Sequence, residues 1–512
     1  MNLEELIPPG CVIERRGPGN PTINSLAYDS RAVTPGALFA AFRGVRDHGL
    51  RHLPQAVRNG AVALLFDGEP EGGWPEFSGP ALLVRDARKT LALTADRFYS
   101  HPSERMDLVG ITGTNGKTTT AYLLESIFNA WGKRVGVIGT IQYRYGSREF
   151  PAATTTPESV DLQQLLKAMV DEGMTHVIME VSSHALIQSR VTGCTFRAAL
   201  FTNLSRDHLD YHRDMADYFE AKSRLFDLLT GGTHGPRPML RLSNGDDPYG
   251  RELRLKYGSD VTTYGMTPES DVSGRILTSG LNGLEILIRW EGGQAVLVSP
   301  LIGTLNAYNV LAASATALHL GIPIEKVQEG VASMRSVPGR MQLLRGMHNE
   351  VAVIDYAHTP DALEKVLNTV ATFSTGRIIT VFGCGGDRDR GKRPLMGRIA
   401  GEKSDILVVT SDNPRSESPR SIIEDIESGV NEAGPVLCTV KEAGSRPKTL
   451  CYFIEEDRRT AIRSAISLAA AGDVVLIAGK GHENYQIIGN ERFHFDDVEE
   501  VVNAFNLKPR IT

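Results

Sequence analysis

Apolar residues along this chain fall into short continuous runs, separated by stretches with helical spacing. Between residues 103 and 240 the runs alternate with amphipathic patterns; the runs lie at 108–111, 135–139, 175–181 and 198–202. Strands that alternate with helices are typical of a parallel sheet, and continuous apolar runs indicate strands buried on both faces. We therefore expect an α/β protein.

The pattern changes at two places along the chain. Short strand-like runs end in a helical pattern at 89–99 and a linker at 100–103, and a second hinge is predicted at SVPGR, 336–340. A length of 512 residues fits about three domains at roughly 150 residues each. The predicted domains are residues 1–102, 103–336 and 337–512.

The end of the second domain has a different pattern. Alternating runs at 260–264, 284–290 and 295–298 are joined by glycine-rich turns. This pattern favours antiparallel hairpins. A helix is expected at 303–320, with Asn306 and Asn309 near its start, where they could meet an adenine edge.

In the third domain, four apolar runs are each followed by a polar loop. The runs are 351–354, 378–382, 406–410 and 474–478, and their loops begin at Asp355, Gly383, Asp412 and Gly479. Loops at the carboxyl ends of parallel strands form the ligand-binding edge of a Rossmann-like sheet. The mixed charges of Arg388, Asp412, Arg415 and Glu483 suit a zwitterion better than a polyphosphate. The segment GCGGDRDRGK has the wrong glycine spacing for a dinucleotide site.

Composition narrows the classes of function. The net charge of −6 argues against a general nucleic-acid or membrane-surface binder. The five cysteines are scattered and lack metal-ligand spacing, which indicates free thiols in a reducing compartment. The first residues do not resemble a signal peptide, and no run approaches about 18 apolar residues. We expect a cytoplasmic protein without membrane insertion, and a monomer.

The strongest motif is VGITGTNGKTTT at 109–120. An apolar run ends in the glycine turn Gly113-Thr114-Asn115-Gly116, and Lys117 and Thr118 begin a helical pattern. Such a loop points backbone N–H groups at a phosphate, with lysine as a point charge and threonine on Mg²⁺. An ordinary strand-to-helix turn is the alternative. The expected fold is thus three α/β domains: a central P-loop-type, mostly parallel sheet with a small antiparallel portion, and a C-terminal Rossmann-like sheet.

Glu180 lies near the end of the apolar run 175–181. An unpaired buried carboxylate is costly, so this residue needs a partner. A second Mg²⁺ ligand opposite Thr118 and a salt bridge at the end of the strand are both possible. A polar cluster that includes Ser182, Gln188 and Arg190 follows at the edge where ligands bind.

Three further residues leave alternatives open. His208 could bind metal or cap a helix. Lys222 lies in the amphipathic pattern 218–229, where an exposed lysine is the default. Ser30 and the polar loop 44–49 could hold a phosphorylated ligand or form a surface turn.

Several motifs occur in order along the chain: GTNGKTT (113–119), TTP (155–157), MEVSSHAL (179–186), FTNLSRDHLDYH (201–212), Lys222, DYAHTPDALEK (355–365) and GCGGDRDRGKRP (383–394). Together they resemble the Mur ligase family of cell-wall peptide ligases over nearly the whole chain. DNPR at 412–415 is similar to the motif of those members that add meso-2,6-diaminopimelate.

This resemblance implies an ATP-dependent amide ligase in peptidoglycan precursor synthesis. ATP would phosphorylate the D-Glu side-chain carboxylate of UDP-N-acetylmuramoyl-L-alanyl-D-glutamate, and the amine of meso-diaminopimelate would then displace phosphate. The implied cofactors are Mg²⁺, held by Thr118 and Glu180 and by His208 and Lys222, and CO₂, which would convert Lys222 to its carbamate. Lys117, Lys222 and His208 would be the catalytic residues.

The resemblance also implies three sets of binding residues. The nucleotide-sugar peptide would contact Ser30, Thr155, Thr156, Ser182, Gln188 and Arg190. ATP would contact the glycine loop from Gly113 to Thr118 together with Asn306, Arg340 and Asp355. Diaminopimelate would contact Arg388, Asp412, Asn413, Pro414, Arg415, Gly479 and Glu483.

Two other functions are weighed against this one. A folylpolyglutamate synthetase shares the glycine loop and the ligase chemistry, but is not expected to carry DNPR or a separate N-terminal domain. A non-catalytic nucleotide-binding regulator needs no acceptor pocket, and the charged C-terminal loops argue against it.

Overall fold

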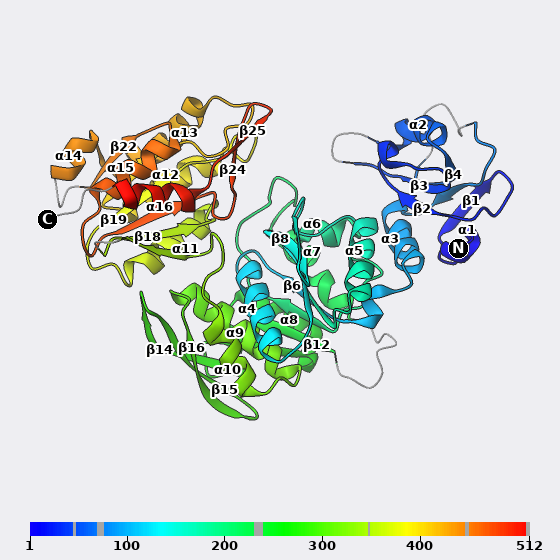
Figure 1. Ribbon diagram of the computed structural model, residues 1–512, viewed down its shortest axis with the longest axis horizontal. Helices are drawn as coiled ribbons and strands as arrows, with labels where there is room; N and C mark the ends of the chain where they lie inside the picture. The colour runs from blue at the N-terminus through cyan, green and yellow to red at the C-terminus, as the bar shows by residue number, and fades with distance from the viewer. Residues whose placement is uncertain (45–47, 69–75, 230–238, 347–348, 446–449, 508–512) are drawn as a thin grey trace.

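The computed structural model describes residues 1–44, 48–68, 76–229, 239–346, 349–445 and 450–507. Three sheets of five, eleven and seven strands follow one another along the chain, with a separate two-stranded hairpin near the C-terminus. In Figure 1 the domain of the eleven-stranded sheet lies between the N-terminal domain, at the right, and the C-terminal domain, at the left. The predicted three-domain α/β fold is confirmed.

The N-terminal sheet has the order β1-β5-β4-β3-β2, and only the pair β1–β5 is antiparallel. Its elements are α1 (Leu3–Leu6), β1 (Val12–Arg16), β2 (Ser25–Ala27), β3 (Ala37–Ala41), α2 (Leu53–Arg58), β4 (Ala61–Phe66), β5 (Ala81–Val84) and α3 (Ala87–Phe98). Residues 45–47 of the polar loop near Ser30 lie outside the described residues.

The central sheet has the order β16-β15-β14-β13-β12-β11-β6-β10-β7-β8-β9. Its strands are β6 (Asp107–Thr112), β7 (Val135–Ile138), β8 (Gln142–Tyr145), β9 (Arg148–Pro151), β10 (His176–Glu180), β11 (Ala198–Phe201), β12 (Leu240–Asn244), β13 (Val261–Gly265), β14 (Val272–Gly280), β15 (Gly283–Trp290) and β16 (Gly293–Ser299). Its helices are α4 (Lys117–Ala130), α5 (Ser159–Asp171), α6 (Ser183–Ile187), α7 (Met215–Asp227), α8 (Pro248–Tyr257), α9 (Thr304–His319) and α10 (Ile324–Ser333).

The central sheet is parallel in its middle and antiparallel at both edges. The predicted hairpins are confirmed for β14–β15–β16, but the prediction is wrong for residues 260–264. That run is β13, which pairs in parallel with both β12 and β14. Helix α8 carries the chain from β12 to the start of β13, the crossover that a parallel pair needs. A second hairpin, β8–β9, extends the other edge.

The C-terminal sheet has the order β17-β18-β23-β19-β20-β22-β21 and is parallel except for β17. Its strands are β17 (Gln342–Arg345), β18 (Val351–Asp355), β19 (Ile378–Phe382), β20 (Ile406–Val409), β21 (Val436–Leu437), β22 (Cys451–Ile454) and β23 (Val474–Ala478), and β24 (Tyr485–Ile488) and β25 (Glu491–His494) form the separate hairpin. Its helices are α11 (Pro360–Ala371), α12 (Lys392–Lys403), α13 (Pro419–Ala433), α14 (Val440–Ser445), α15 (Arg458–Leu468) and α16 (Asp497–Leu507).

Helices cover both faces of the C-terminal sheet, which explains the continuous apolar runs of its strands. Alternate residues of β18 point to opposite faces: Val353 packs in the cluster with helices α11, α12 and α13, and Ile354 in the cluster with α15 and α16. The carboxyl ends of β18, β23, β19 and β20 therefore meet at one edge, as predicted from their loops.

A buried ion pair supports this edge from behind. Arg458 donates from Nε and Nη2 to the two carboxylate oxygens of Asp497, both at 2.8 Å, and both side chains are fully buried. Arg458 Nη2 also donates to the carbonyl of Ala478, the last residue of β23, at 3.1 Å. The pair thus fixes the strand end that leads to Gly479.

We predict that Asp497→Ala lowers the free energy of unfolding of the C-terminal domain by about 3–5 kcal/mol, because Arg458 is left buried and unpaired. Urea unfolding measures this change. Glu424→Ala, which breaks the exposed Arg420–Glu424 pair, is the control and should cost less than about 1 kcal/mol. Equal losses in the two variants would contradict the predicted role of the buried pair.

Among the described residues, no helix has the length and apolar character needed to cross a membrane.

Candidate active site

The glycine loop connects β6 to the first residue of α4, Lys117. Gly113 and Gly116 have φ angles of 141° and 88°, which favour glycine. A Cβ atom on either would also collide with a neighbour, Thr202 Oγ1 at the first and Asn309 Oδ1 at the second. The loop between them is fixed by Asn203, whose Oδ1 accepts from the Asn115 N–H at 3.0 Å. The sequence thus builds a rigid loop with the N-terminus of α4 behind it.

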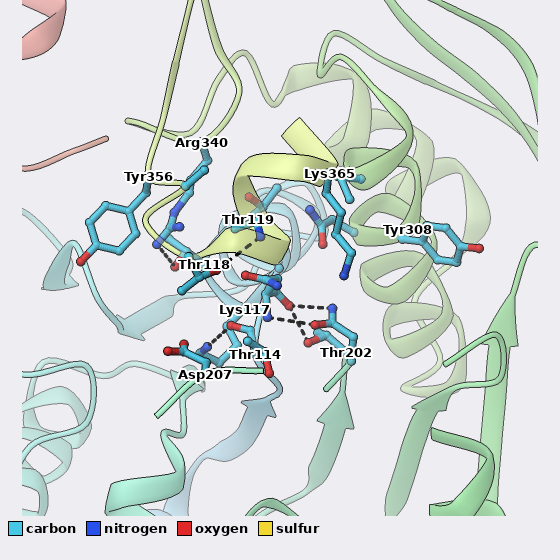
Figure 2. Close-up of a pocket in the computed structure, with 18 of the residues that line it drawn as sticks. Thr114, Lys117, Thr118, Thr119, Thr202, Asp207, Tyr308, Arg340, Tyr356 and Lys365 are labelled. Atoms are coloured by element: carbon cyan, nitrogen blue, oxygen red, sulfur yellow. Dashed lines mark hydrogen bonds between the residues drawn. The ribbon is translucent and has the colours of Figure 1, made fainter. Parts of the chain in front are cut away.

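This loop lines a cavity of about 540 Å³ between the central and C-terminal domains. Figure 2 shows Arg340, from the C-terminal side, pointing toward Thr118, with Tyr356 beside Arg340. Lys117 Nζ donates to the carbonyls of Gly113 and Thr114 at 3.0 and 2.9 Å. Burial lowers the pKa of Lys117, so its charge is poorly solvated and suited to an anionic ligand.

Glu180 lies at the end of β10 and is only 1% exposed. Its carboxylate accepts from Thr118 Oγ1 at 3.0 Å, and from the N–H and Oγ1 of Thr140, both at 2.9 Å. Among the described residues no cation forms an ion pair with Glu180, so the salt-bridge alternative finds no support in the structure. Thr118 and Glu180 are hard oxygen donors that line one cavity, and this pair fits Mg²⁺.

Lys222 is buried, although the sequence pattern predicted an exposed side chain at this position. It lies on α7 and is 2% exposed. Its Nζ donates to the carbonyl of Gly113 at 2.7 Å and lies 4.6 Å from the centre of the Tyr218 ring. Burial, followed by the charge of Lys117, lowers the pKa of Lys222 well below the usual lysine value. The pattern failed because α7 turns this position toward the glycine loop.

His208 lines the same cavity as Lys222. Its backbone has a φ of 53°, and its Nε2 lies 3.5 Å from Asp207 Oδ2. No group of three or more His, Cys, Asp or Glu side chains is arranged to hold a metal in the part of the chain that the structure describes. The predicted second site contains only one residue of these types, His208, beside Lys222.

The residues predicted for the nucleotide-sugar peptide come together only in part at the first cavity. Thr156 Oγ1 donates to the carbonyl of Glu180 at 2.9 Å and accepts from the N–H of Ser182 at 3.1 Å. Arg190 donates to the Gln188 side chain at 2.7 Å and to the carbonyl of Thr156 at 2.9 Å. Thr155 and Ser182 line the cavity itself. Ser30 does not join them: it lies in the N-terminal domain, where its Oγ donates to Gln55 at 2.8 Å.

The residues predicted for ATP do come together. Asn306, Arg340 and Asp355 all line the first cavity. Asn306 is buried and accepts from Asn309 Nδ2 at 3.1 Å. The Arg340 guanidinium lies 4.5 Å from the centre of the Tyr356 ring and its Nη2 is 3.5 Å from Thr118 Oγ1. Burial raises the pKa of Asp355.

A second cavity of about 610 Å³ adjoins the first at the edge of the C-terminal sheet. Its walls include all but one of the residues predicted for the amino acid: Arg388, Asp412, Asn413, Arg415, Gly479 and Glu483. Pro414 is not among them. Burial, and then the charge of Asp412, raises the pKa of Glu483. The two cavities share a wall formed by Asp207, His208, Tyr356, His358 and Thr359.

Comparison with known proteins identifies relatives over nearly the whole chain. Three family models match the chain: "Mur ligase family, catalytic domain" at 22–99, "Mur ligase middle domain" at 111–317 and "Mur ligase, glutamate ligase domain" at 339–481. The chain is 47% identical to the UDP-N-acetylmuramoyl-L-alanyl-D-glutamate–2,6-diaminopimelate ligase of Geobacter metallireducens over 94% of each protein. It is 44% identical to that of Geobacter sulfurreducens over 99% of each.

The chain belongs to the Mur ligase family.

A solved structure of such a 2,6-diaminopimelate ligase has a TM-score of 0.65 and 33% identity, covering 94% of this chain and 95% of that one. A folylpolyglutamate synthase of Mycobacterium tuberculosis has a TM-score of 0.60 at 18% identity, which shows a common fold and nothing about substrate. The predicted family is confirmed.

Two residues that line the cavities, Lys365 and Asp207, were not among the predicted site residues. Lys365 lines the first cavity and pairs with Asp361 at 2.9 Å, four residues earlier on α11. Asp207 lies in the wall that the two cavities share; burial acts to raise its pKa, but the charges of His208 and His358 outweigh burial and the pKa is lowered. Both residues occur in the motifs quoted above. For Lys365 the available signal was the spacing of four residues between Asp361 and Lys365 in DALEK, which predicts an ion pair on one face of a helix.

Proposed function

We propose that this Mur ligase adds meso-2,6-diaminopimelate to UDP-N-acetylmuramoyl-L-alanyl-D-glutamate, with hydrolysis of ATP to ADP and phosphate. The supporting observation is the pair of adjoining cavities: one carries a phosphate-binding loop, and the other carries mixed charges for an amino acid. Because the two cavities adjoin, an acyl phosphate formed in the first cavity would lie close to an amine bound in the second cavity. The product would serve as a peptidoglycan precursor.

In the first step, an oxygen of the D-Glu side-chain carboxylate attacks the γ-phosphorus of ATP. The bond to the β-γ bridging oxygen breaks and ADP leaves, so the carboxylate becomes an acyl phosphate. The glycine-loop N–H groups and Lys117 would hold the β- and γ-phosphates. Thr118 and Glu180 would hold Mg²⁺, which neutralises charge on the phosphates. Asn306, Arg340 and Asp355 would position the nucleotide.

In the second step, the amine of diaminopimelate attacks the acyl carbon, and the tetrahedral intermediate expels phosphate. The amine must be neutral and must lose a proton as the amide forms. Glu483 lies in the amino-acid cavity, and its raised pKa makes it a better proton acceptor than an ordinary glutamate. Arg388 and Arg415 would bind the carboxylates of the diacid.

Lys222 is proposed to act as its carbamate. The neutral amine, which burial favours here, attacks the carbon of CO₂, forms an N–C bond and releases a proton to solvent. The resulting carbamate of Lys222 places an anionic oxygen beside Lys117, where an ammonium group on Lys222 would be a second cation. With His208 it would hold a second Mg²⁺.

We predict that Lys222→Ala lowers kcat by about 100-fold, and that added short-chain carboxylates such as acetate partly restore it. The carboxylate would take the place of the lost carbamate oxygen. Lys167→Ala is the control, because Lys167 is a surface residue on α5 that pairs with Asp171. An active Lys222→Ala enzyme would return this residue to a structural role.

The chemistry is tested by labelling the D-Glu side-chain carboxylate with ¹⁸O. An acyl phosphate intermediate transfers one labelled oxygen to the released phosphate, so labelled inorganic phosphate is expected. Unlabelled phosphate would contradict the mechanism.

We further propose that the protein acts in the cytoplasm as a monomer. No disulfide bond joins any two of the five cysteines, all of which lie in the described part of the chain, and this suits a reducing compartment. The site needs no residue from a second chain, since both cavities are built within one. The acidic net charge gives no basis for a nucleic-acid partner.

A further inference from the structure

The hairpin β24–β25 lies outside the seven-stranded sheet but packs on the loop that contains DNPR. Its strands pair from Tyr485 with His494 to Ile488 with Glu491. Tyr485 lines the second cavity, and the next residue, Gln486, is not among the described residues that do. Gln486 therefore faces the loop rather than the space for the amino acid.

Four hydrogen bonds join the hairpin to residues 412–415. The Arg415 N–H donates to the carbonyl of Ile487 at 3.1 Å, and the Gly489 N–H donates to the carbonyl of Arg415 at 2.7 Å. The Ile487 N–H donates to Asn413 Oδ1 at 2.9 Å. Gln486 Nε2 donates to the carbonyl of Asp412 at 2.7 Å. The loop is thus held like an added strand beside β24.

This support is needed because the loop is not a relaxed turn. Arg415 has a φ of 52°, a left-handed conformation that is unfavourable for a residue with a side chain. Asn413 is 2% exposed, and its amide nitrogen donates to Glu483 at 2.8 Å. Its amide oxygen accepts from Lys480 at 3.2 Å as well as from Ile487. Asn413 therefore has its hydrogen bonds within the protein and fixes the loop.

Among the four hydrogen bonds, only the one from Gln486 depends on a side chain of the hairpin. The other three use backbone groups of the hairpin and do not depend on the side chain at position 486. The Gln486 side chain hydrogen-bonds to the carbonyl of Asp412, which lies three residues before Arg415 in the sequence. A selective site requires its charged groups to be held within about 0.5 Å of the productive geometry.

We propose that Gln486 is a positioning residue for amino-acid selectivity: it fixes the Asp412–Arg415 loop so that Arg415 meets the second carboxylate of the diacid. This inference rests on the proposed function, in which Arg415 binds diaminopimelate. Gln486 itself does not touch the amino acid.

Two variants test the proposal in the full-length enzyme. Gln486→Met keeps the length of the side chain and removes its donor, and Gln486→Glu places a carboxylate against the Asp412 carbonyl. Gln486→Met should raise the KM for meso-diaminopimelate about threefold to tenfold, the range of one hydrogen bond, with kcat nearly unchanged. Gln486→Glu should raise the KM for meso-diaminopimelate further, because its carboxylate would lie against the carbonyl of Asp412. In both, the ratio of kcat/KM for diaminopimelate to that for L-lysine should fall by a similar factor.

The control is Glu491→Gln, an exposed position on β25 of the same hairpin. It should leave the KM for diaminopimelate within about twofold of wild type. The KM values for ATP and for the nucleotide dipeptide should stay unchanged in all three variants, which separates positioning of the loop from general damage to the fold.

Two results would overturn the proposal: an unchanged KM for diaminopimelate in both Gln486 variants, or an equal rise in the KM of all three substrates. Failure of the proposed function itself looks different, because wild-type enzyme would then fail to use diaminopimelate before any variant is compared.

Discussion

Replacement of Lys117 by alanine is expected to lower kcat by about 10²–10³-fold, as for the loss of one preorganised charge contact in the transition state. Lys117 is the first residue of α4, and its ammonium group lies against the glycine-loop carbonyls, at the place proposed for the phosphates. Charge accumulates on the phosphoryl oxygens during transfer, and alanine offers nothing to stabilise it. Release of ADP at saturating substrates measures the change.

Lys117→Met is a useful second variant, because methionine fills the space of the lysine stem without its charge. It should be as inactive as the alanine variant and should unfold at the wild-type temperature. Lys326→Ala is the matched control, since Lys326 is exposed on α10 and pairs with Glu329. Near-normal turnover in a folded Lys117 variant would refute the proposed phosphate site.

The second large effect concerns the choice of amino acid. Wild-type enzyme is expected to prefer meso-diaminopimelate over L-lysine by up to about 10⁴-fold in kcat/KM. The two differ by a carboxylate beside the distal amine. In the structure the guanidinium of Arg415 donates to the carbonyl of Gly386 at 2.7 Å, and lysine would leave it without a carboxylate partner in the second cavity.

Arg415→Ala should lower kcat/KM for diaminopimelate by more than about tenfold, the equivalent of one charged hydrogen bond. Arg415→Lys keeps the charge but lacks the planar fork, so it should restore activity only in part. Steady-state kinetics with both amino acids measure these ratios. If wild-type enzyme ligates lysine as well as diaminopimelate, Arg415 is not the selecting residue.

The strands were the most predictable feature of the fold. The runs 378–382 and 474–478 coincide with β19 and β23, because continuous apolar segments have few alternatives to a buried strand. The run 260–264 was assigned to a hairpin because periodicity does not report strand direction. Direction follows from the crossover helix α8, which no local pattern around β13 contains.

The site was predictable where one motif contains the whole arrangement, as in the glycine loop and its helix. It was less predictable where partners lie far apart in the sequence. The burial of Lys222 depends on the carbonyl of Gly113, and the support of Asp412 depends on Gln486. The hydrophobic pattern predicts an exposed Lys222, because such a pattern depends on the polarity of each residue and contains no information about its distant partners.

The most direct test of the account is ADP release by the purified enzyme with ATP, the nucleotide dipeptide and a panel of amino acids. We predict release only when the dipeptide and meso-diaminopimelate are both present, with a product whose mass is their sum less one water. L-Lysine and L-glutamate should give only background rates. Equal release with lysine, or release with glutamate and a folate in place of the nucleotide dipeptide, would contradict the proposed function.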